Sequence, residues 1–253
     1  MSMFVIMEPL PRESRAPAAP SVAPADSTAS TWYASAKVGL EISAALVLLI
    51  FTAPVILFAM ILIRVTSPGP AIYTQTRLGR HGVPFTIYKL RTMANDAESL
   101  TGAQWSKPGD SRVTRLGRWL RKTHIDELPQ LWNVLRGDMS LIGPRPERPE
   151  FLPQLEQAIP LYRQRLQVKP GITGFAQIQL PPDSDFDSVR LKLAYDLHYV
   201  QNVSLLFDLT IYLGTIFKLI GFTYEALRPL CRFPKRATLE TAYKNLFAGA
   251  VKR

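Results

Sequence analysis

The longest apolar segment of the chain runs from Val38 to Ile63, and Glu41 is its only charged residue. Lys37 and Arg64 flank it. A segment of this length can cross the hydrocarbon core of a bilayer as a helix. It is too long and begins too late for a cleavable signal peptide, and no small-residue cleavage pattern follows it. The pattern predicts a membrane-inserted helix at residues 37–66.

Pro54 lies near the middle of this segment, where it removes a backbone hydrogen bond and clashes with the preceding turn. A kink is expected there. Two topologies are compatible with it: a kinked helix that spans the bilayer, or a re-entrant helix that leaves the membrane on the side it entered. Basic residues follow the segment, which favours a cytoplasmic position for the C-terminal part of the chain; they are Arg64, Arg77, Arg80, Lys89 and Arg91.

Weaker patterns surround this segment. Pro, Ala and Ser dominate residues 8–30 without an apolar period, so residues 1–36 are predicted to be a disordered tail. Two strand-like segments, 71–77 and 83–90, are joined by Gly79-Arg80-His81-Gly82, which predicts a β-hairpin. Residues 112–122 are predicted to be helical, with a basic stripe of Arg112, Arg115 and Arg118 that is equally compatible with a solvated helix face.

The rest of the chain favours helices, at Phe151–Leu155, Leu161–Leu166 and Ser188–Ile220, with a turn at Lys169–Gly174. The predicted fold is therefore α+β and mainly helical, with a small β-hairpin, an N-terminal membrane helix and amphipathic helices at the membrane interface. We divide it into a folded domain at 67–222 and a basic C-terminal extension at 223–253.

Composition narrows the function. A net charge of +10 and a pI near 9.9 indicate an anionic partner: nucleic acid, an acidic membrane surface or a phosphorylated substrate. The single cysteine, Cys231, permits no internal disulfide, and three scattered histidines make a zinc site improbable. Any metal is expected on carboxylates. The Rossmann and Walker A phosphate-binding sequences are absent.

The adjacent acidic residues Asp126 and Glu127 lie just before Pro129, which is tolerated only in the first turn of a helix. Both carboxylates are thus expected at the positive end of a helix dipole, which would keep Asp126 ionised and nucleophilic. A divalent cation would offset the repulsion between two anions and a diphosphate. The competing interpretation is an ordinary helix cap, worth about 1 kcal/mol.

Basic residues provide candidate phosphate contacts. Arg145 lies between two prolines that restrict its backbone, and its planar guanidinium suits bidentate phosphate binding, although a surface arginine beside a turn fits equally well. Lys89 and Arg91 share one face of the predicted strand because side chains alternate with a period of two.

Several motifs occur together in this chain. Asp126-Glu-Leu-Pro-Gln-Leu131, Gly137-Asp-Met-Ser140 and Gly143-Pro-Arg-Pro146 follow one another, with Tyr88-Lys-Leu-Arg-Thr-Met93 upstream and Lys169-Pro-Gly-Ile-Thr-Gly174 downstream. In this order and spacing, over about residues 37–220, the chain resembles the bacterial sugar transferases, the monotopic phosphoglycosyl transferases. Leu90 stands where that family usually has Phe.

The resemblance implies an enzyme in which Asp126 attacks the β-phosphate of a UDP-sugar, releases UMP, and passes the phosphosugar to polyprenyl (undecaprenyl) phosphate, as the first membrane step of glycan or exopolysaccharide assembly. Glu127 would help to hold Mg²⁺. Lys89, Arg91 and Arg145 would bind substrate phosphates, with Asp196 and Arg118 as looser candidates. The resemblance also implies a re-entrant helix in the bacterial inner membrane, with the catalytic domain, residues 67–222, on the cytoplasmic face.

Two other classes of protein remain to be weighed. A membrane-anchored, catalytically inactive lipid-binding or scaffold protein explains the basic charge and the apolar segment, but it needs no such set of motifs. A nucleic-acid-binding protein explains the charge and not the apolar segment, and no nucleic-acid motif is present. The expected partners are therefore a UDP-sugar, polyprenyl phosphate and membrane lipid, without nucleic acid. No motif specifies the sugar or an oligomeric state.

Overall fold

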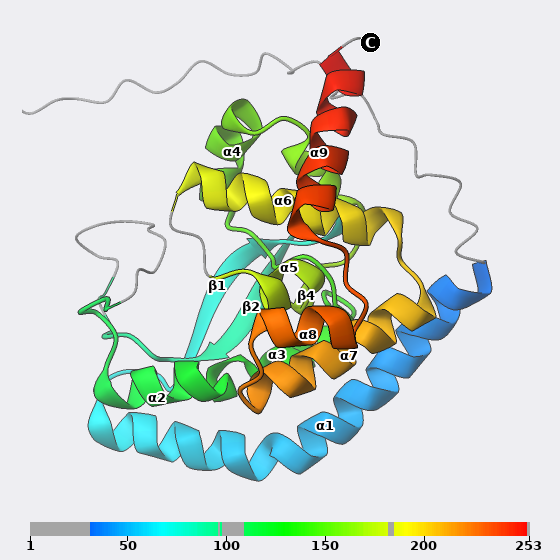
Figure 1. The fold of residues 1–253 in the computed structure, drawn as a ribbon. Helices are drawn as coiled ribbons and strands as arrows, with labels where there is room; N and C mark the ends of the chain where they lie inside the picture. Colours follow the sequence, from blue (N-terminus) through cyan, green and yellow to red (C-terminus); the bar gives the residue numbers. More distant parts are fainter. Residues whose placement is uncertain (1–30, 96, 98–108, 182–184, 252–253) are drawn as a thin grey trace, which may run out of the picture.

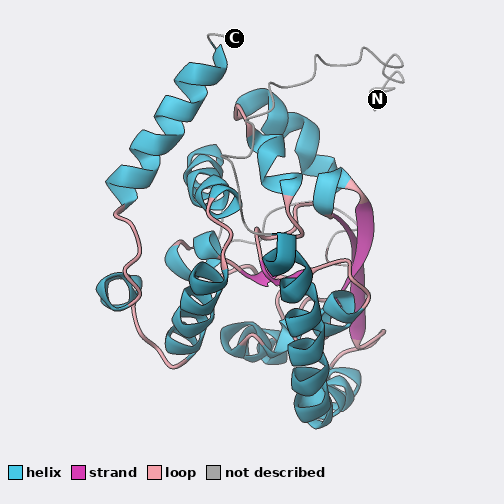
Figure 2. Ribbon diagram, turned by 90° about the vertical axis from the view of Figure 1, so that its right-hand side faces the viewer, coloured by secondary structure: helices cyan, strands magenta, loops and turns pink. Residues whose placement is uncertain are grey.

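The computed structural model describes residues 31–251 apart from 96, 98–108 and 182–184, so the predicted tail at 1–30 lies outside it. Among the described residues, helices dominate and strands are short, which confirms the predicted α+β class (Figures 1 and 2). The helices are α1 (Thr31–Thr66), α2 (Arg115–Thr123), α3 (Gln130–Leu135), α4 (Leu152–Ala158), α5 (Phe175–Gln179), α6 (Phe186–Gln201), α7 (Leu205–Leu219), α8 (Tyr224–Leu230) and α9 (Arg236–Val251). The strands are β1 (Ile72–Leu78), β2 (Pro84–Leu90), β3 (Ser140–Ile142) and β4 (Gly171–Thr173).

Helix α1 contains the apolar segment and begins before the predicted start. Residues 31–36, predicted as tail, form its first turns because Tyr33 is buried there and its hydroxyl donates a hydrogen bond to Asp208. Pro54 lies inside an otherwise continuous helix, and Figure 1 shows a bend near the middle of α1 rather than a break into two helices. Helix α1 therefore accommodates the missing N–H of Pro54 by bending.

Both halves of α1 pack against the folded body. Ala45, in the first half, lies in a core cluster with residues of β2, α3 and β3, among them Ile87 and Leu131. Ile56 and Ile63, in the second half, pack with residues at the ends of the hairpin and in α2. Figure 1 accordingly shows α2, α3 and α7 lying along α1.

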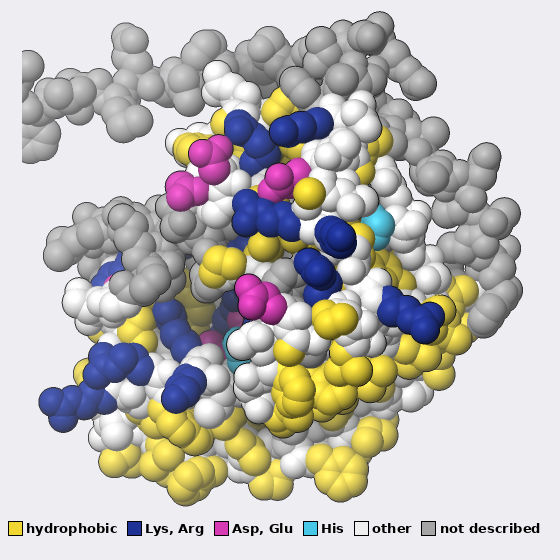
Figure 3. Space-filling view, in the orientation of Figure 1, with side chains coloured by type: hydrophobic (Ala, Val, Ile, Leu, Met, Phe, Trp, Pro, Cys, Tyr) yellow, Lys and Arg dark blue, Asp and Glu magenta, His cyan; other side chains and the backbone are white. Residues whose placement is uncertain are grey.

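The opposite face of α1 is apolar and exposed. Ser35–Thr66 is long and apolar enough to cross a membrane, the one such helix in the described part of the chain, and only 17% of its most apolar window is buried. The helix at the core of a soluble protein would be mostly buried. Figure 3 shows the apolar surface along the lower edge of the molecule, where it continues onto α7; its exposed members include Phe51, Leu57, Phe58, Ile61, Leu206, Leu213 and Ile216. An apolar surface of this extent indicates membrane association.

The predicted hairpin is present. Strands β1 and β2 are antiparallel, from Ile72 opposite Leu90 to Leu78 opposite Pro84, and a 3₁₀ turn at Arg80–Gly82 joins them. Gly82 has a φ of 79°, which favours glycine over residues with a side chain. The hairpin lies at one side of the helical body (Figure 2) and directs the end of β2 towards the segment between α2 and α3.

A second, parallel pair of strands was not predicted. Strand β3 pairs with β4, Ser140 opposite Gly171 and Ile142 opposite Thr173. The two backbones approach so closely that a Cβ on Gly171 would lie 2.0 Å from the Gly143 nitrogen. Glycine is thus required in both motifs for packing, and three-residue strands are too short to show a period of two.

The helices of the second half differ from the prediction in several ways. The segment predicted to be helical at Leu161–Leu166 is a 3₁₀ helix at Tyr162–Gln167, and α5 was not predicted. The predicted continuous helix at 188–220 is divided into α6 and α7, because the Ser204 side chain caps α7 by accepting a hydrogen bond from Phe207 N. Beyond residue 222, α8 and α9 follow. Leu239 and Tyr243 of α9 are buried in core clusters with α6, so the segment named a C-terminal extension packs onto the domain.

Candidate active site

The acidic pair lies in a tight turn between two helices. Helix α2 ends at His124, which adopts a left-handed conformation with φ 56°, and a 3₁₀ turn at Ile125–Glu127 leads to α3. Pro129 immediately precedes α3, as predicted for a residue confined to a helix start. Ile125 and Leu128 pack into the core beneath α2 and anchor the turn that carries both carboxylates.

Glu127 is held by two cations from different parts of the fold. Lys89 Nζ, at the end of β2, lies 2.9 Å from Glu127 Oε1, and an Arg145 guanidinium nitrogen lies 2.7 Å from the same oxygen. Burial alone would raise the pKa of Glu127, but Arg145 and Lys89 outweigh it and hold that pKa well below its usual range. Glu127 is therefore a permanent anion at neutral pH.

The pKa of Asp126 is shifted in the opposite direction. Its side chain is buried, with 7% of the residue exposed, and within the described residues its carboxylate is charge-coupled to its neighbours without a hydrogen bond. Burial first, and the Glu127 charge second, raise the pKa of Asp126 to about 6, against the opposing charges of Lys89, Arg121 and Arg145. The expected dipole stabilisation does not dominate, because Asp126 lies in a 3₁₀ turn ahead of α3 rather than on its first turn.

The cations are themselves affected by burial. Burial lowers the pKa of Lys89 to about 8, partly offset by the Glu127 charge. Arg145, by contrast, is partly exposed and follows β3 within the Gly143–Pro146 loop. One buried lysine and one accessible arginine thus converge on Glu127, and both residues were predicted to belong to the site.

Asp196 stabilises the loop that carries Arg145, through contacts with Arg165. Its buried carboxylate pairs with Arg165 at 2.8 Å, and Arg165 in turn donates a hydrogen bond of 2.9 Å to the Arg145 carbonyl. Burial would lower the pKa of Arg165, but Tyr162 and Asp196 outweigh it and raise that pKa above its ordinary value. The structure therefore places Asp196 in contact with Arg165, as a support for the Arg145 loop.

Arg91 and Arg118 are not brought to the acidic pair. The Arg91 guanidinium donates to the carbonyls of Ser67 and Pro68, at 2.8 and 2.7 Å, and thereby holds the segment that follows α1. Strand β2 ends at Leu90, so the alternation that placed Arg91 beside Lys89 no longer applies at residue 91. Arg118 is exposed on α2 and donates to the Val113 carbonyl at 3.2 Å.

Arg121 is a site residue that sequence reasoning missed. Its charge lowers the pKa of Asp126, and its Nε donates a hydrogen bond of 2.9 Å to Thr92 Oγ1. The signal was present, since Arg121 continues the three-residue spacing of the basic stripe on α2. Figure 3 shows a hollow above α2 with Lys and Arg side chains beside it.

The carboxylates limit the kind of metal that fits. Within the described residues no group of three His, Cys, Asp or Glu side chains could hold an ion. Mg²⁺ commonly uses one or two protein carboxylates and completes its shell with water and substrate phosphates. Asp126, to which no described residue donates a hydrogen bond, and the ionised Glu127 fit that mode, in which Glu127 would loosen its contacts with Lys89 and Arg145.

A carboxylate pair surrounded by Lys89, Arg121 and Arg145 is a site suited to phosphate chemistry. The family model for bacterial sugar transferases matches residues 32–221, and the chain belongs to this family.

Curated relatives agree with this membership. Over 184 residues the chain is 45% identical to a UDP-N-acetylgalactosamine-undecaprenyl-phosphate N-acetylgalactosaminephosphotransferase of Aeromonas hydrophila, covering 73% of this chain and 43% of that protein. It is 46% identical over 179 residues to a UDP-glucose:undecaprenyl-phosphate glucose-1-phosphate transferase of Caulobacter vibrioides, covering 70% and 67%. It is 38% identical to an exopolysaccharide production protein of Rhizobium leguminosarum, covering 71% and 92%. The match thus spans less than half of the Aeromonas protein.

Proposed function

We propose that this protein transfers a phosphosugar from a UDP-sugar to undecaprenyl phosphate through a covalent intermediate on Asp126. The observation that carries the proposal is a buried carboxylate that accepts no hydrogen bond within the described part of the chain, beside a glutamate that two cations keep ionised. With a pKa of about 6, Asp126 is roughly nine-tenths ionised at pH 7. It combines availability as a nucleophile with the reactivity of a poorly solvated anion.

In the first step an Asp126 carboxylate oxygen attacks the β-phosphorus of the UDP-sugar. A bond forms between that oxygen and phosphorus, and the bond from phosphorus to the oxygen that bridges the two phosphates breaks. UMP leaves with the bridging oxygen and its electron pair. Lys89, Arg121 and Arg145 provide the positive charge that stabilises the phosphoryl oxygens and the leaving phosphate.

In the second step a phosphate oxygen of undecaprenyl phosphate attacks the same phosphorus. The bond from phosphorus to the Asp126 oxygen breaks, which regenerates the carboxylate and yields a sugar linked to the lipid by a diphosphate. A Mg²⁺ ion held by Glu127 would neutralise phosphate charge in both steps. The chain's own contribution is to exclude water around Asp126 and to hold its cations in place.

The reaction needs a site where a lipid head group and a soluble nucleotide sugar meet. We infer that α1 is re-entrant and holds the catalytic domain on the cytoplasmic face of the bacterial inner membrane, as the first membrane step of glycan or exopolysaccharide assembly. This topology is supported by the packing of both halves of α1 onto the same folded body, whereas a spanning helix would separate one end from it.

The function is tested by incubating the purified protein with undecaprenyl phosphate and a panel of UDP-sugars. A panel is needed because the relatives' names differ in their sugar. We expect release of UMP with at least one donor, and a phosphosugar adduct in the intact mass when the acceptor is omitted. Asp126→Asn should lose both, while Asp187→Asn, on the exposed start of α6, should retain both. No UMP from any donor would leave a lipid-binding or scaffold protein as the better interpretation.

Topology is tested separately by cysteine labelling in intact cells. Ser27→Cys in a Cys231→Ser background places one thiol before α1. A re-entrant helix protects this thiol from an impermeant reagent until the membrane is opened. Labelling from outside the cell would establish a spanning helix.

A further inference from the structure

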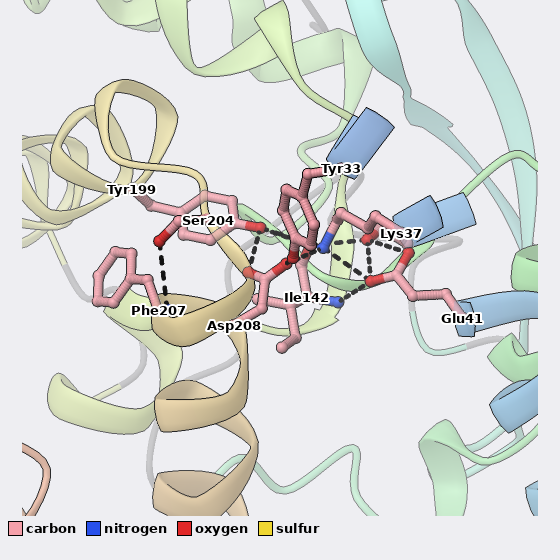
Figure 4. Close-up of polar contacts among 9 residues, drawn as sticks. Tyr33, Lys37, Glu41, Ile142, Tyr199, Ser204, Phe207 and Asp208 are labelled. Carbon is pink, nitrogen blue, oxygen red and sulfur yellow. Dashed lines mark hydrogen bonds and ion pairs between the residues drawn. The ribbon is translucent and has the colours of Figure 1, made fainter. Parts of the chain in front are cut away.

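A buried polar cluster lies between the start of the apolar helix α1 and helices α6 and α7, remote in sequence from the acidic pair. Figure 4 shows its members: Tyr33, Lys37 and Glu41 of α1 face Tyr199 and Asp208 of the second half of the chain. Lys37 forms ion pairs with both Glu41 and Asp208. Charged groups in a segment of this kind are costly to bury and indicate a specific task.

The Glu41 carboxylate contacts strand β3 directly. Ser140 Oγ lies 2.7 Å from both carboxylate oxygens of Glu41, and the Ile142 backbone N–H donates to Oε1 at 3.4 Å. The Ile142 carbonyl accepts from Ser140 Oγ at 2.8 Å and from the Tyr199 hydroxyl at 3.2 Å. On its other side β3 pairs with β4. Glu41 and Tyr199 therefore occupy the position that a further strand would take beside β3.

Strand β3 leads within three residues to Arg145, the partly exposed cation on Glu127. The connection is stiff, because Gly143 N bonds to Thr173 O and Gly171 N bonds to Pro144 O, both at 2.9 Å. A shift of β3 is thus transmitted to the Arg145 backbone. On the other side of that loop Arg165 holds the Arg145 carbonyl.

We propose that Glu41 is a positioning residue, through which the seating of the membrane helix sets the place of Arg145 at the acidic pair. The proposal rests on the proposed function for its kinetic part only. Glu41 touches no reacting atom and acts through β3. When α1 is fully seated, β3 is held on both edges and Arg145 meets Glu127; when the contact is lost, one edge of β3 is free.

Hydrogen exchange tests the coupling without any activity. In Glu41→Ala, peptides covering residues 140–147 should exchange faster than in the wild type. Glu41→Gln should restore part of the protection, because its amide oxygen still accepts from Ser140 and Ile142. Ser140→Ala approaches the same contact from the strand and leaves α1 intact, which keeps the test decisive if Glu41→Ala folds poorly. Glu240→Ala, at an exposed ion pair on α9, is the matched control. Unchanged exchange at 140–147 in both Glu41→Ala and Ser140→Ala would overturn the proposal.

A double-mutant cycle tests the consequence for transfer. Glu41→Ala should lower kcat/KM about tenfold, the scale of one hydrogen bond to a charged group. In an Arg145→Gln background the same substitution should change it by less than about twofold, because the route through Arg145 is already lost. Fully additive effects would refute action through Arg145. If the wild type released no UMP, the proposed function would fail while the exchange experiment still decided the coupling.

Discussion

Two pairs of carboxylates in the described part of the chain are largely shielded from solvent, Glu41 with Asp208 and Asp126 with Glu127, and they differ in how completely they are paired. Asp208 accepts hydrogen bonds from Tyr33 and Tyr199 and forms an ion pair with Lys37, and Glu41 is equally well supplied. At the candidate active site Glu127 has two cations, whereas Asp126 accepts no hydrogen bond from any residue that the structure describes. Burial of the carboxylates is therefore not what distinguishes the pair at the candidate active site. What distinguishes this pair is that Asp126 accepts no hydrogen bond from the described residues, whereas its neighbour Glu127 is held by two cations.

The strongest test of this difference is to replace Asp by Asn in each pair and to compare the free energies of unfolding. Ionised Asp126 costs folding free energy, because its pKa is raised from 3.8 to about 6; that cost is absent below pH 4 and complete above pH 6. In chelator at pH 8, Asp126→Asn should therefore stabilise the protein by up to about 3 kcal/mol. Asp208→Asn should destabilise it by roughly 2–4 kcal/mol, since Lys37 loses a partner. Denaturant unfolding in detergent measures both, and a loss of stability in Asp126→Asn would contradict the assigned environment.

Removal of the paired carboxylate at the active site should weaken transfer. Glu127→Gln leaves Lys89 and Arg145 without their anion and takes away the proposed magnesium ligand, so we expect turnover to fall on the order of 10²-fold. The concentration of Mg²⁺ needed for half-maximal rate should rise at the same time. Wild-type activity that persists in excess chelator would exclude the magnesium role.

The pH dependence of transfer tests Asp126 separately, because Glu127 stays ionised over the same pH range. If Asp126 is the proposed nucleophile, only its ionised carboxylate attacks phosphorus, so kcat/KM should fall about tenfold per pH unit below pH 6 and level off above it. Adduct formation with donor alone, followed by mass spectrometry, measures this limb without the acceptor. A flat profile between pH 5 and 7 would mean that Asp126 is not the titrating nucleophile.

The smallest effect is expected from a matched pair of arginines on α2. Arg121→Gln removes a charge that acts on Asp126 and should lower kcat/KM about tenfold. Arg118→Gln, on the exposed face, should alter neither activity nor stability beyond about 0.5 kcal/mol. Equal losses in both variants would show that α2 contributes only a diffuse positive field.

The features that could be predicted from the sequence are those that several neighbouring residues indicate together. The apolar segment, the hairpin and the acidic pair before Pro129 each rest on several neighbouring residues, and the structure contains all three. Lys89 and Arg145, predicted to bind substrate phosphates, lie 56 residues apart and both contact Glu127, while their predicted contact with phosphate stays a prediction.

What the sequence did not predict depends on contacts between distant residues. Asp196 was only a looser candidate, because its partner, Arg165, lies 31 residues earlier in the chain. Arg91 was assigned by strand alternation at a position where the strand has already ended. Glu41 looked like an interruption of an apolar segment, since nothing near it in the chain marks Ser140 as its partner.

The separation of these partners along the chain also sets an order in time. Lys37 and Asp208 are 171 residues apart, so α1 leaves the ribosome long before its counter-charge exists. At 5–20 residues per second the delay is roughly ten to thirty seconds. Until Asp208 is made, Lys37 has only Glu41 of the two ion-pair partners that it has in the structure. The Lys37–Asp208 ion pair can therefore form only after α7 has been synthesised, although the partners of α1 in the hairpin, α2, α3 and β3 are made earlier.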